Sequence, residues 1–143
     1  MATADEYRSG LETKRAALHA AIEAAGDGWE QAPEGDEEWS PRAVAEHVVG
    51  SEYYFAGLVA AAMQGKAPDR PSELSFDSNK DALSALDEAS EAADKTFRYV
   101  EDRDLEKAAE LDGGDRFAST IEGVLQLATW HRDDHTKQIR AAS

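Results

Sequence analysis

The chain has 143 residues, of which 41% are hydrophobic, so its length fits one domain, over residues 1–143, with enough apolar material for a sizeable core. Its 30 acidic and 15 basic side chains give a formal charge of −15, which repels nucleic-acid phosphates and anionic lipid headgroups and argues against both as partners. The chain has no cysteine, which excludes disulfides, thiolate ligands and thiol nucleophiles.

The composition also favours a soluble helical protein. No apolar run approaches the ~20 residues that a membrane-spanning helix needs, and the first residues lack the basic and apolar parts of a secretory signal. We therefore expect a cytoplasmic protein with no membrane partner. Alanine is frequent and the chain has only four prolines, which favours an all-α fold.

The first predicted helix covers residues 4–25, where apolar residues recur at three- and four-residue spacing on one face. Gly26 is expected to end it. Residues 27–39 follow as a polar, acidic connection that is too long for a tight helical hairpin. Its two tryptophans, Trp29 and Trp39, are expected to fold back onto the helices.

The second predicted helix has the clearest start signal, because Ser40 can cap its free amides and Pro41 suits the first helical position. It is expected to run to Gln64, with Gly65 just beyond its end. His47 falls inside the apolar stripe of this helix, not at its margin. The other members of the stripe are Val44, Val48, Ser51, Tyr54, Phe55, Leu58 and Ala62.

The next connection, residues 66–77, is long enough to cross a helical bundle. About a dozen residues at ~3.3 Å each reach ~40 Å, which is close to the length of a helix of about 24 residues. The connection therefore allows the helices on either side of it to run parallel. The third predicted helix, residues 78–101, has a narrow apolar seam and no histidine.

A weakly structured stretch containing Gly113 and Gly114 leads into the last predicted helix. Ser119 and Glu122 match a capping box at its start. Its expected buried stripe consists of Ile121, Val124, Leu125, Ala128, His131, His135 and Ile139. Four amphipathic helices of similar length predict an all-α four-helix bundle with a long crossover connection between the second and third helices.

The pattern of histidines predicts a metal site. His131 and His135 are four residues apart and share one helical face. A single histidine on an apolar face is usually a core residue, but this pair together with His47 would place three imidazoles in an otherwise apolar interior, where each needs a partner. Imidazole suits Zn²⁺, Ni²⁺, Fe²⁺ or Co²⁺. Three protein ligands leave coordination positions for water or substrate.

Several polar residues stand near these histidines in the sequence. Gln138 lies at the edge of the stripe, where it either touches a ligand or is a surface residue. Ser51 and Tyr54 either line the pocket or pack against neighbouring side chains. Asp134 and Glu46 point to other faces and are expected to be solvated.

Two further residues are not assigned to the site. His19 lies at the edge of the first helix's stripe and is expected to be structural or exposed. Trp130 points away from the buried stripe and is expected to pack under a loop or at a subunit interface.

Two segments carry a family resemblance. The segment from Trp39 to His47 reads WSPRAVAEH, and the segment from Trp130 to Ile139 reads WHRDDHTKQI. In order, spacing and placement they resemble motifs of the DinB superfamily of metalloenzymes, and the resemblance covers the whole chain. It implies a four-helix bundle, frequently a homodimer, with a divalent metal ion on His47, His131 and His135.

The resemblance also implies an activity. Related members include thiol-dependent enzymes, namely bacillithiol S-transferases and mycothiol-dependent maleylpyruvate isomerase. The chain would then be a metal-dependent S-transferase that joins a low-molecular-weight thiol to a small-molecule substrate in detoxification or stress response. Lys137 replaces a small residue often seen before the glutamine, which weighs against the isomerase activity. Two alternatives stay open: a metal-water hydrolase, and a non-enzymatic, stress-related binding or scaffold protein with a structural metal.

Overall fold

The computed structural model describes residues 2–25, 40–71 and 74–142. Within them the secondary structure is helical, with one isolated bridge and no strand, and this confirms the predicted all-α class. The elements are α1 (Ala4–Ala24), α2 (Pro41–Ala62), α3 (Asn79–Phe97), the 3-10 turn η2 (Asp102–Asp104) and α4 (Ile121–Ala142). None of the described helices has the length and apolar character needed to cross a bilayer.

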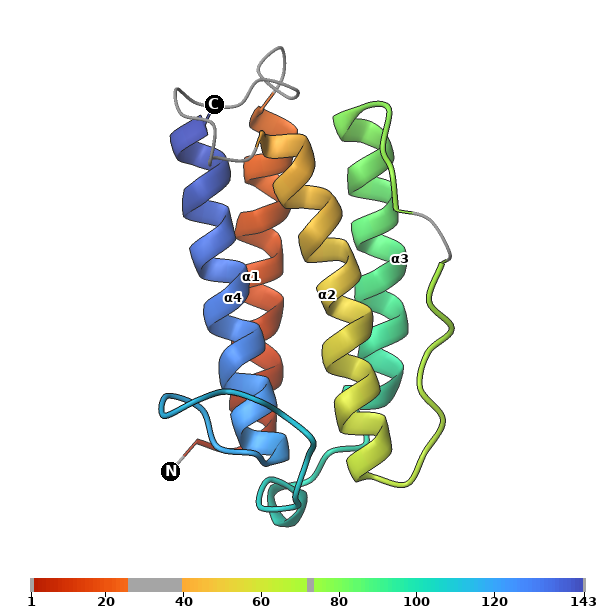
Figure 1. The fold of residues 1–143 in the computed structure, drawn as a ribbon, viewed down its shortest axis with the longest axis vertical. Helices are drawn as coiled ribbons and strands as arrows, with labels where there is room; N and C mark the ends of the chain where they lie inside the picture. Colours follow the sequence, from red (N-terminus) through yellow and green to blue (C-terminus); the bar gives the residue numbers. More distant parts are fainter. Residues whose placement is uncertain (1, 26–39, 72–73, 143) are drawn as a thin grey trace.

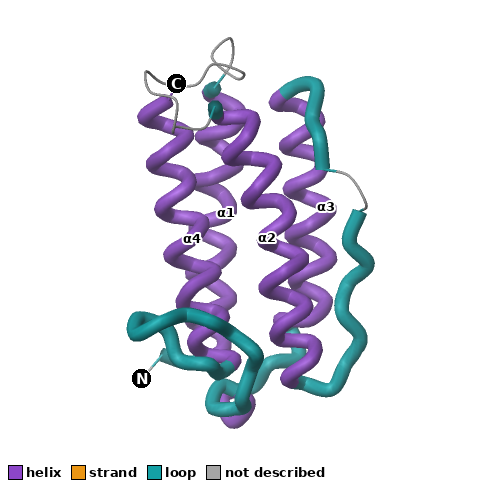
Figure 2. The backbone as a smooth tube through the Cα atoms, in the orientation of Figure 1, coloured by secondary structure: helices purple, strands orange, loops and turns teal. Residues whose placement is uncertain are grey.

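The helices form a four-helix bundle in which α1 and α4 run in one direction and α2 and α3 run in the other (Figure 1). The described parts of the connection from α2 to α3 lie along the outside of α3, as Figure 2 shows, so these two consecutive helices are parallel. This confirms the long crossover. Each helix packs against two others: α2 contacts α3 and α4, and α1 contacts the same two helices.

Side-chain caps begin all four helices, and those of the first three are alike. Thr3, Ser40 and Ser78 precede α1, α2 and α3, and the hydroxyl oxygen of each accepts the backbone N–H three residues further on at 3.2 Å. Such caps satisfy amides that have no partner within the helix. The predicted start of α2 at Ser40 and Pro41 is confirmed. The predicted end of the first helix at Gly26 and the packing of Trp29 and Trp39 lie outside the described residues.

Two predicted helix ends are wrong. The helix α2 ends at Ala62 and not at Gln64, and Gln64, with φ 59°, is the left-handed residue that follows it. The N–H of Gly65 donates to the carbonyl of Ala60 at 2.8 Å and that of Gln64 to the carbonyl of Ala61 at 3.1 Å, which is the Schellman arrangement. α3 ends at Phe97, four residues before the predicted end.

An arginine from another helix closes the end of α3. Arg8 on α1 donates from Nη1 to the carbonyl oxygens of Phe97, at 3.0 Å, and Val100, at 2.7 Å. These contacts satisfy carbonyls that a longer helix would have used itself.

The segment before α4 is more ordered than the sequence predicted. Ala108 forms an isolated antiparallel bridge with Thr120, and the carbonyl of Lys107 accepts the N–H of Ile121 at 3.0 Å. The predicted capping box at Ser119 is wrong, because its hydroxyl donates to a loop carbonyl. Thr120 is the side-chain cap, accepting the N–H of Gly123 at 3.1 Å.

Two apolar clusters of buried residues fill the interior, one towards each end of the bundle. The first includes Leu11, Phe55, Val59, Phe97, Leu125 and Ala128. The second includes Leu18, Ile22, Val44, Val48, Leu86 and Ile139. Their helices carry the candidate site on the face shared by α2 and α4.

Candidate metal centre

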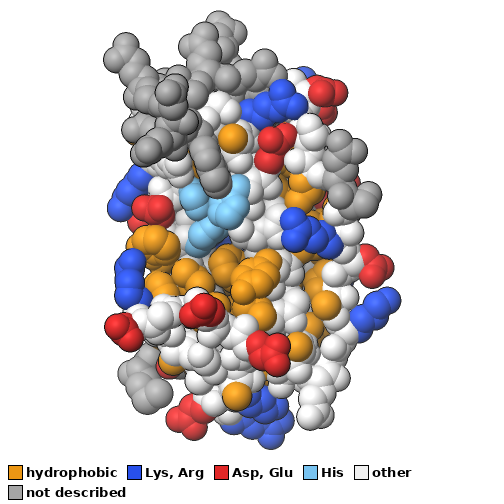
Figure 3. Space-filling model, in the orientation of Figure 1, with side chains coloured by type: hydrophobic (Ala, Val, Ile, Leu, Met, Phe, Trp, Pro, Cys, Tyr) orange, Lys and Arg blue, Asp and Glu red, His pale blue; other side chains and the backbone are white. Residues whose placement is uncertain are grey.

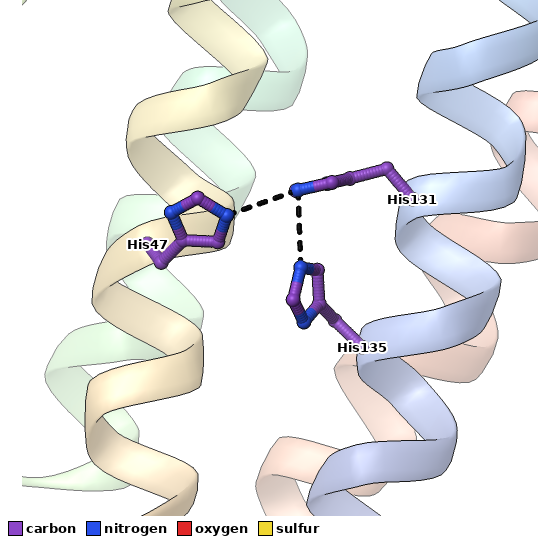
Figure 4. A group of neighbouring side chains, drawn as sticks. All are labelled: His47, His131 and His135. Atoms are coloured by element: carbon purple, nitrogen blue, oxygen red, sulfur yellow. Dashed lines mark hydrogen bonds between the residues drawn. The ribbon is translucent and has the colours of Figure 1, made fainter. Parts of the chain in front are cut away.

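Three histidines from two helices converge on one point. His47 lies near the N-terminus of α2, and His131 and His135 lie one turn apart in α4. Because α2 and α4 are antiparallel neighbours, the first turns of α2 face the C-terminal half of α4. All three rings point into the space between the two helices (Figure 4).

The spacing of the ring nitrogens fits one metal ion. Nε2 of His131 lies 3.0 Å from Nε2 of His47 and 3.0 Å from Nε2 of His135. One nitrogen from each of the three residues lies within 4.8 Å of the others. Metal–imidazole bonds are ~2.0–2.1 Å long, so a single ion is able to contact nitrogens this close together. The all-nitrogen donor set suits Zn²⁺, Ni²⁺ or Fe²⁺.

The cluster lies at the surface of the bundle and not in its interior. His47 is exposed and the other two histidines are half-buried, and Figure 3 shows a pale blue histidine patch on the face formed by α2 and α4. The prediction that His47 sits inside the buried stripe was wrong. Because α2 packs against both α3 and α4, its buried side is centred on Ala45, Val49 and Ala56. The position leaves the cluster accessible to small molecules.

The surroundings keep two of the imidazoles neutral. Burial lowers the pKa of His131 to about 3, and the neighbouring His135 and His47 add to this effect. Although His47 is exposed as a whole, burial of part of it lowers its pKa as well, with His135 contributing. Neutral imidazole is the form that binds a metal ion. Both residues are therefore ready to act as ligands at neutral pH.

The outer ring nitrogens of the two histidines of α4 differ. Nδ1 of His135 hydrogen bonds with Oε1 of Gln138 at 2.7 Å, so Gln138 touches a candidate ligand and is not merely a surface residue. Nδ1 of His131 is buried without a hydrogen-bond partner among the described residues. Its ring instead packs edge-on against Phe55, with centroids 5.5 Å apart.

The other polar residues near the histidines either hold the backbone in place or are exposed. Ser51 donates its hydroxyl to the backbone carbonyl of His47 at 3.0 Å and so belongs to the helix. Tyr54 is 49% exposed, and Asp134 is exposed as predicted. Glu46 is not simply solvated, because its carboxylate accepts the backbone N–H of residue 76 at 2.9 Å and ties the crossover to α2.

Neither Trp130 nor His19 belongs to the histidine cluster, as predicted. Trp130 is 39% exposed, and its ring packs against Phe117 of the preceding loop and under the guanidinium of Arg116, which lies 4.6 Å from the ring centroid. The predicted packing against a loop is confirmed. His19 has a side chain that is 39% exposed, beside Asp87 at 3.8 Å.

Sequence reasoning missed a buried ion pair behind the histidines. Glu52 on α2 and Arg132 on α4 are each 1% exposed, so the prediction of an almost wholly apolar interior was wrong. Arg132 directly follows His131. The signal was present, because each residue falls at helical spacing between buried apolar residues: Glu52 between Val48 and Phe55 on α2, and Arg132 between Ala128 and Ile139 on α4.

Two opposing effects set the charge of Glu52. Burial opposes ionisation of its carboxyl group, but Arg132 and Arg15 outweigh that effect and hold the pKa of Glu52 below its usual value. Glu52 is therefore ionised at neutral pH, and its negative charge lies in the core.

The sequence pattern of the DinB superfamily matches residues 10–139, which include all three histidines. The chain belongs to the DinB superfamily. No curated protein and no solved structure matches the chain. DinB-like proteins bind metal ions, and among the described residues of this member the cluster of His47, His131 and His135 could hold one.

Proposed function

We propose that this DinB protein binds a divalent metal ion through His47, His131 and His135 and transfers a low-molecular-weight thiol to a small electrophilic substrate. The observation that carries the proposal is the convergence of three imidazole nitrogens, within 4.8 Å of one another, at an accessible place on the bundle. The family resemblance supports it, because the two segments that carry it contain these histidines and related members include thiol-dependent enzymes.

The side chains have separate tasks in this proposal. The three Nε2 atoms hold the ion, and Gln138 fixes the ring orientation of His135. Held by these residues, such an ion would act as a Lewis acid that lowers the pKa of the substrate thiol, so that the thiolate would be present near neutral pH. The thiol proton passes to solvent, a sulfur lone pair forms the bond to the electrophilic carbon, and the leaving group departs with the electrons of the broken bond.

The geometry favours a reactive site over a structural one. Structural zinc sites are usually closed by four protein ligands, whereas reactive sites keep a position open. Among the described residues, the metal-binding group contains three side chains, of which His47 is exposed. A metal-water hydrolase would use the same open position, and assays with thiol and ester substrates separate the two activities.

The setting of the reaction follows from its chemistry. We place the protein in the cytoplasm, where thiols stay reduced, and assign it to detoxification or stress response, since the reaction would remove electrophiles. A homodimer is proposed from the family resemblance alone, and sedimentation velocity tests it.

The test of the proposed function is a thiol-transfer assay on metal-loaded protein. Samples loaded with Zn²⁺, Ni²⁺ or Fe²⁺ are mixed with monochlorobimane and one of cysteine, glutathione, bacillithiol or mycothiol, and the fluorescent thioether is followed. We expect acceleration with at least one thiol, lost in the variant His47→Ala/His131→Ala/His135→Ala. His19→Ala, which removes the histidine outside the site, should retain the activity.

Two results would contradict the proposal. Equal rates for the wild type and the triple variant would show that the histidines take no part. Metal binding without turnover of any thiol would favour the structural-metal alternative, and hydrolysis of a nitrophenyl ester by the same sample would favour the hydrolase.

A further inference from the structure

A layer of charged side chains crosses the core between the two apolar clusters. The Nε and Nη2 atoms of Arg132 on α4 donate to the two carboxylate oxygens of Glu52 on α2, and both residues are 1% exposed. Arg15 on α1 donates to Oε2 of Glu52 at 3.1 Å and also binds Asp94 on α3. The charged layer therefore joins all four helices.

The charged layer lies beside the histidines. Arg132 follows His131 directly, and Thr136, which follows His135, donates its buried hydroxyl to the carbonyl of Arg132 at 2.7 Å. Along α2, Glu52 is one turn beyond Val48 and about one turn before Ala56. Each of these neighbours belongs to a different apolar cluster, so the charged layer interrupts the core at a single level.

We propose that Glu52 and Arg132 form a positioning pair, which fixes α2 against α4 and so sets the separation of His47 from the two histidines of α4. The inference rests on the proposed metal site. Two parallel hydrogen bonds between a planar guanidinium and a carboxylate permit one relative placement of the two helices. Apolar contacts alone allow several nearly equivalent placements, which is why a single buried polar residue fixes register in coiled coils.

Stability alone does not account for this pair. Replacing a buried ion pair by apolar residues of similar volume is often neutral or stabilising, because removing two charges from water is costly. A metal site is more demanding, since its ligand distances must hold to within ~0.2 Å. A shift between α2 and α4 that apolar packing tolerates would therefore move His47 out of reach of an ion held by His131.

The test replaces both members of the buried pair, so that neither Glu52 nor Arg132 is left without its partner. In Glu52→Leu/Arg132→Met, Arg15 keeps its contact with the exposed carboxylate of Asp94. We expect this variant to fold, as judged by circular dichroism, and to bind Zn²⁺ about 10-fold to 100-fold more weakly in competition with a chromophoric chelator. The visible absorption of its Co²⁺ form should differ from that of the wild type, since that absorption reports ligand geometry.

Two further variants separate an effect on the placement of the metal ligands from an effect on the stability of the fold. Arg132→Lys keeps the positive charge but loses the planar guanidinium, so it should show the same weaker Zn²⁺ binding. This variant tests the proposal even if the double variant does not fold. The matched control is Lys14→Gln/Asp133→Asn, which breaks a half-exposed ion pair, 2.9 Å long, between α1 and α4. The control should match the wild type in Zn²⁺ affinity and in Co²⁺ spectrum.

The outcomes are distinct. Wild-type Zn²⁺ affinity and Co²⁺ spectrum in the double variant and in Arg132→Lys would overturn the positioning role and leave the metal site intact. A wild-type protein that binds neither ion would overturn both this inference and the proposed function.

Discussion

At the scale of single residues, the two histidines of α4 are supported differently. His135 has a hydrogen bond from its outer ring nitrogen to Gln138, while the outer nitrogen of His131 is buried without a hydrogen-bond partner among the described residues. The orientation of His131 therefore depends on packing, in particular against Phe55. The orientation of His135 depends on one polar contact, which a substitution is able to remove.

Removing that contact should weaken the site. Gln138→Leu deletes the acceptor for Nδ1 of His135, so we expect Zn²⁺ affinity to fall by about 10-fold to 100-fold, the usual effect of losing such a partner. Competition with a chromophoric chelator measures the change. Gln126→Leu, which removes an exposed contact between α4 and Tyr7 of α1, should leave the affinity unchanged. Equal affinities for both variants would contradict the assigned role of Gln138.

The lowered pKa of His131 predicts a pH dependence of stability in metal-free protein. The unfolded chain takes up a proton near the ordinary histidine pKa of 6.5, whereas in the folded protein the pKa of His131 is about 3 and the ring stays neutral above that pH. The unfolded state therefore binds more protons in this window, and the free energy of unfolding falls as the pH falls, by at most ~1.4 kcal/mol per pH unit. Glu52, with its lowered pKa, contributes the same sign but only below its usual value of 4.5.

Urea denaturation in the presence of a chelator, between about pH 7 and about pH 5, measures this effect. His131→Gln should be less sensitive to pH than the wild type over that range, because Gln does not titrate. A pH dependence that is the same in both proteins would show that His131 does not resist protonation in the fold.

The residue-level prediction was correct in which histidines meet and wrong in where they lie. The i, i+4 spacing of His131 and His135 follows from helix geometry alone, and α4 places both rings on one side of the helix. Exposure depends on how α2 is rotated between its two neighbours. No local pattern around His47 contains that information.

At the scale of the elements, the contact between α2 and α4 depends on a buried charge pair. Glu52→Gln leaves the guanidinium of Arg132 buried without its counter-charge, so we expect a loss of ~3–5 kcal/mol in the free energy of unfolding. Lys14→Gln, which breaks a half-exposed pair with Asp133, should cost no more than ~1 kcal/mol. Equal and small losses in urea denaturation would contradict the burial of the charged pair.

Two helical glycines should respond in opposite ways to alanine. A Cβ on Gly123, in the first turn of α4, would lie 1.8 Å from the carbonyl oxygen of Ala118. Gly123→Ala should therefore displace the loop before α4 and destabilise the protein. A Cβ on Gly10, within α1, meets nothing within 4 Å, so Gly10→Ala should raise the stability by ~0.5–1 kcal/mol. Thermal unfolding of both variants measures this contrast, and destabilisation by Gly10→Ala would contradict it.

The helix boundaries show which local signals suffice. The start of α2 was predictable because Ser40 and Pro41 act within one turn. The start of α4 was not, because the amides of Ile121 and Glu122 are satisfied by carbonyls of Lys107 and Leu105. Those partners lie more than ten residues away in the sequence, and the match of Ser119 to a capping box does not reveal them.

At the scale of the whole molecule, the crossover between α2 and α3 determines which helices meet at the site. The helix α4 runs opposite to α3, and the crossover makes α2 parallel to α3. As a result α2 is antiparallel to α4, and the two helices are in contact. The length of residues 66–77 showed that such a crossover was possible, and the apolar face on each of four predicted helices indicated a bundle. The charged layer was not anticipated, because single charges within the apolar stripes of α2 and α4 identify their partners only after the helices are assembled.

Elemental analysis of purified, untagged protein tests the metal site most simply, beside His47→Ala and His131→Ala and with His19→Ala as the matched control. We expect about one bound divalent metal ion per chain in the wild type and in His19→Ala. Both site variants should lose that metal and keep their helical circular dichroism spectrum. A wild-type protein that contains no metal and takes up neither Zn²⁺ nor Ni²⁺ on incubation would show that the three histidines are not a metal site.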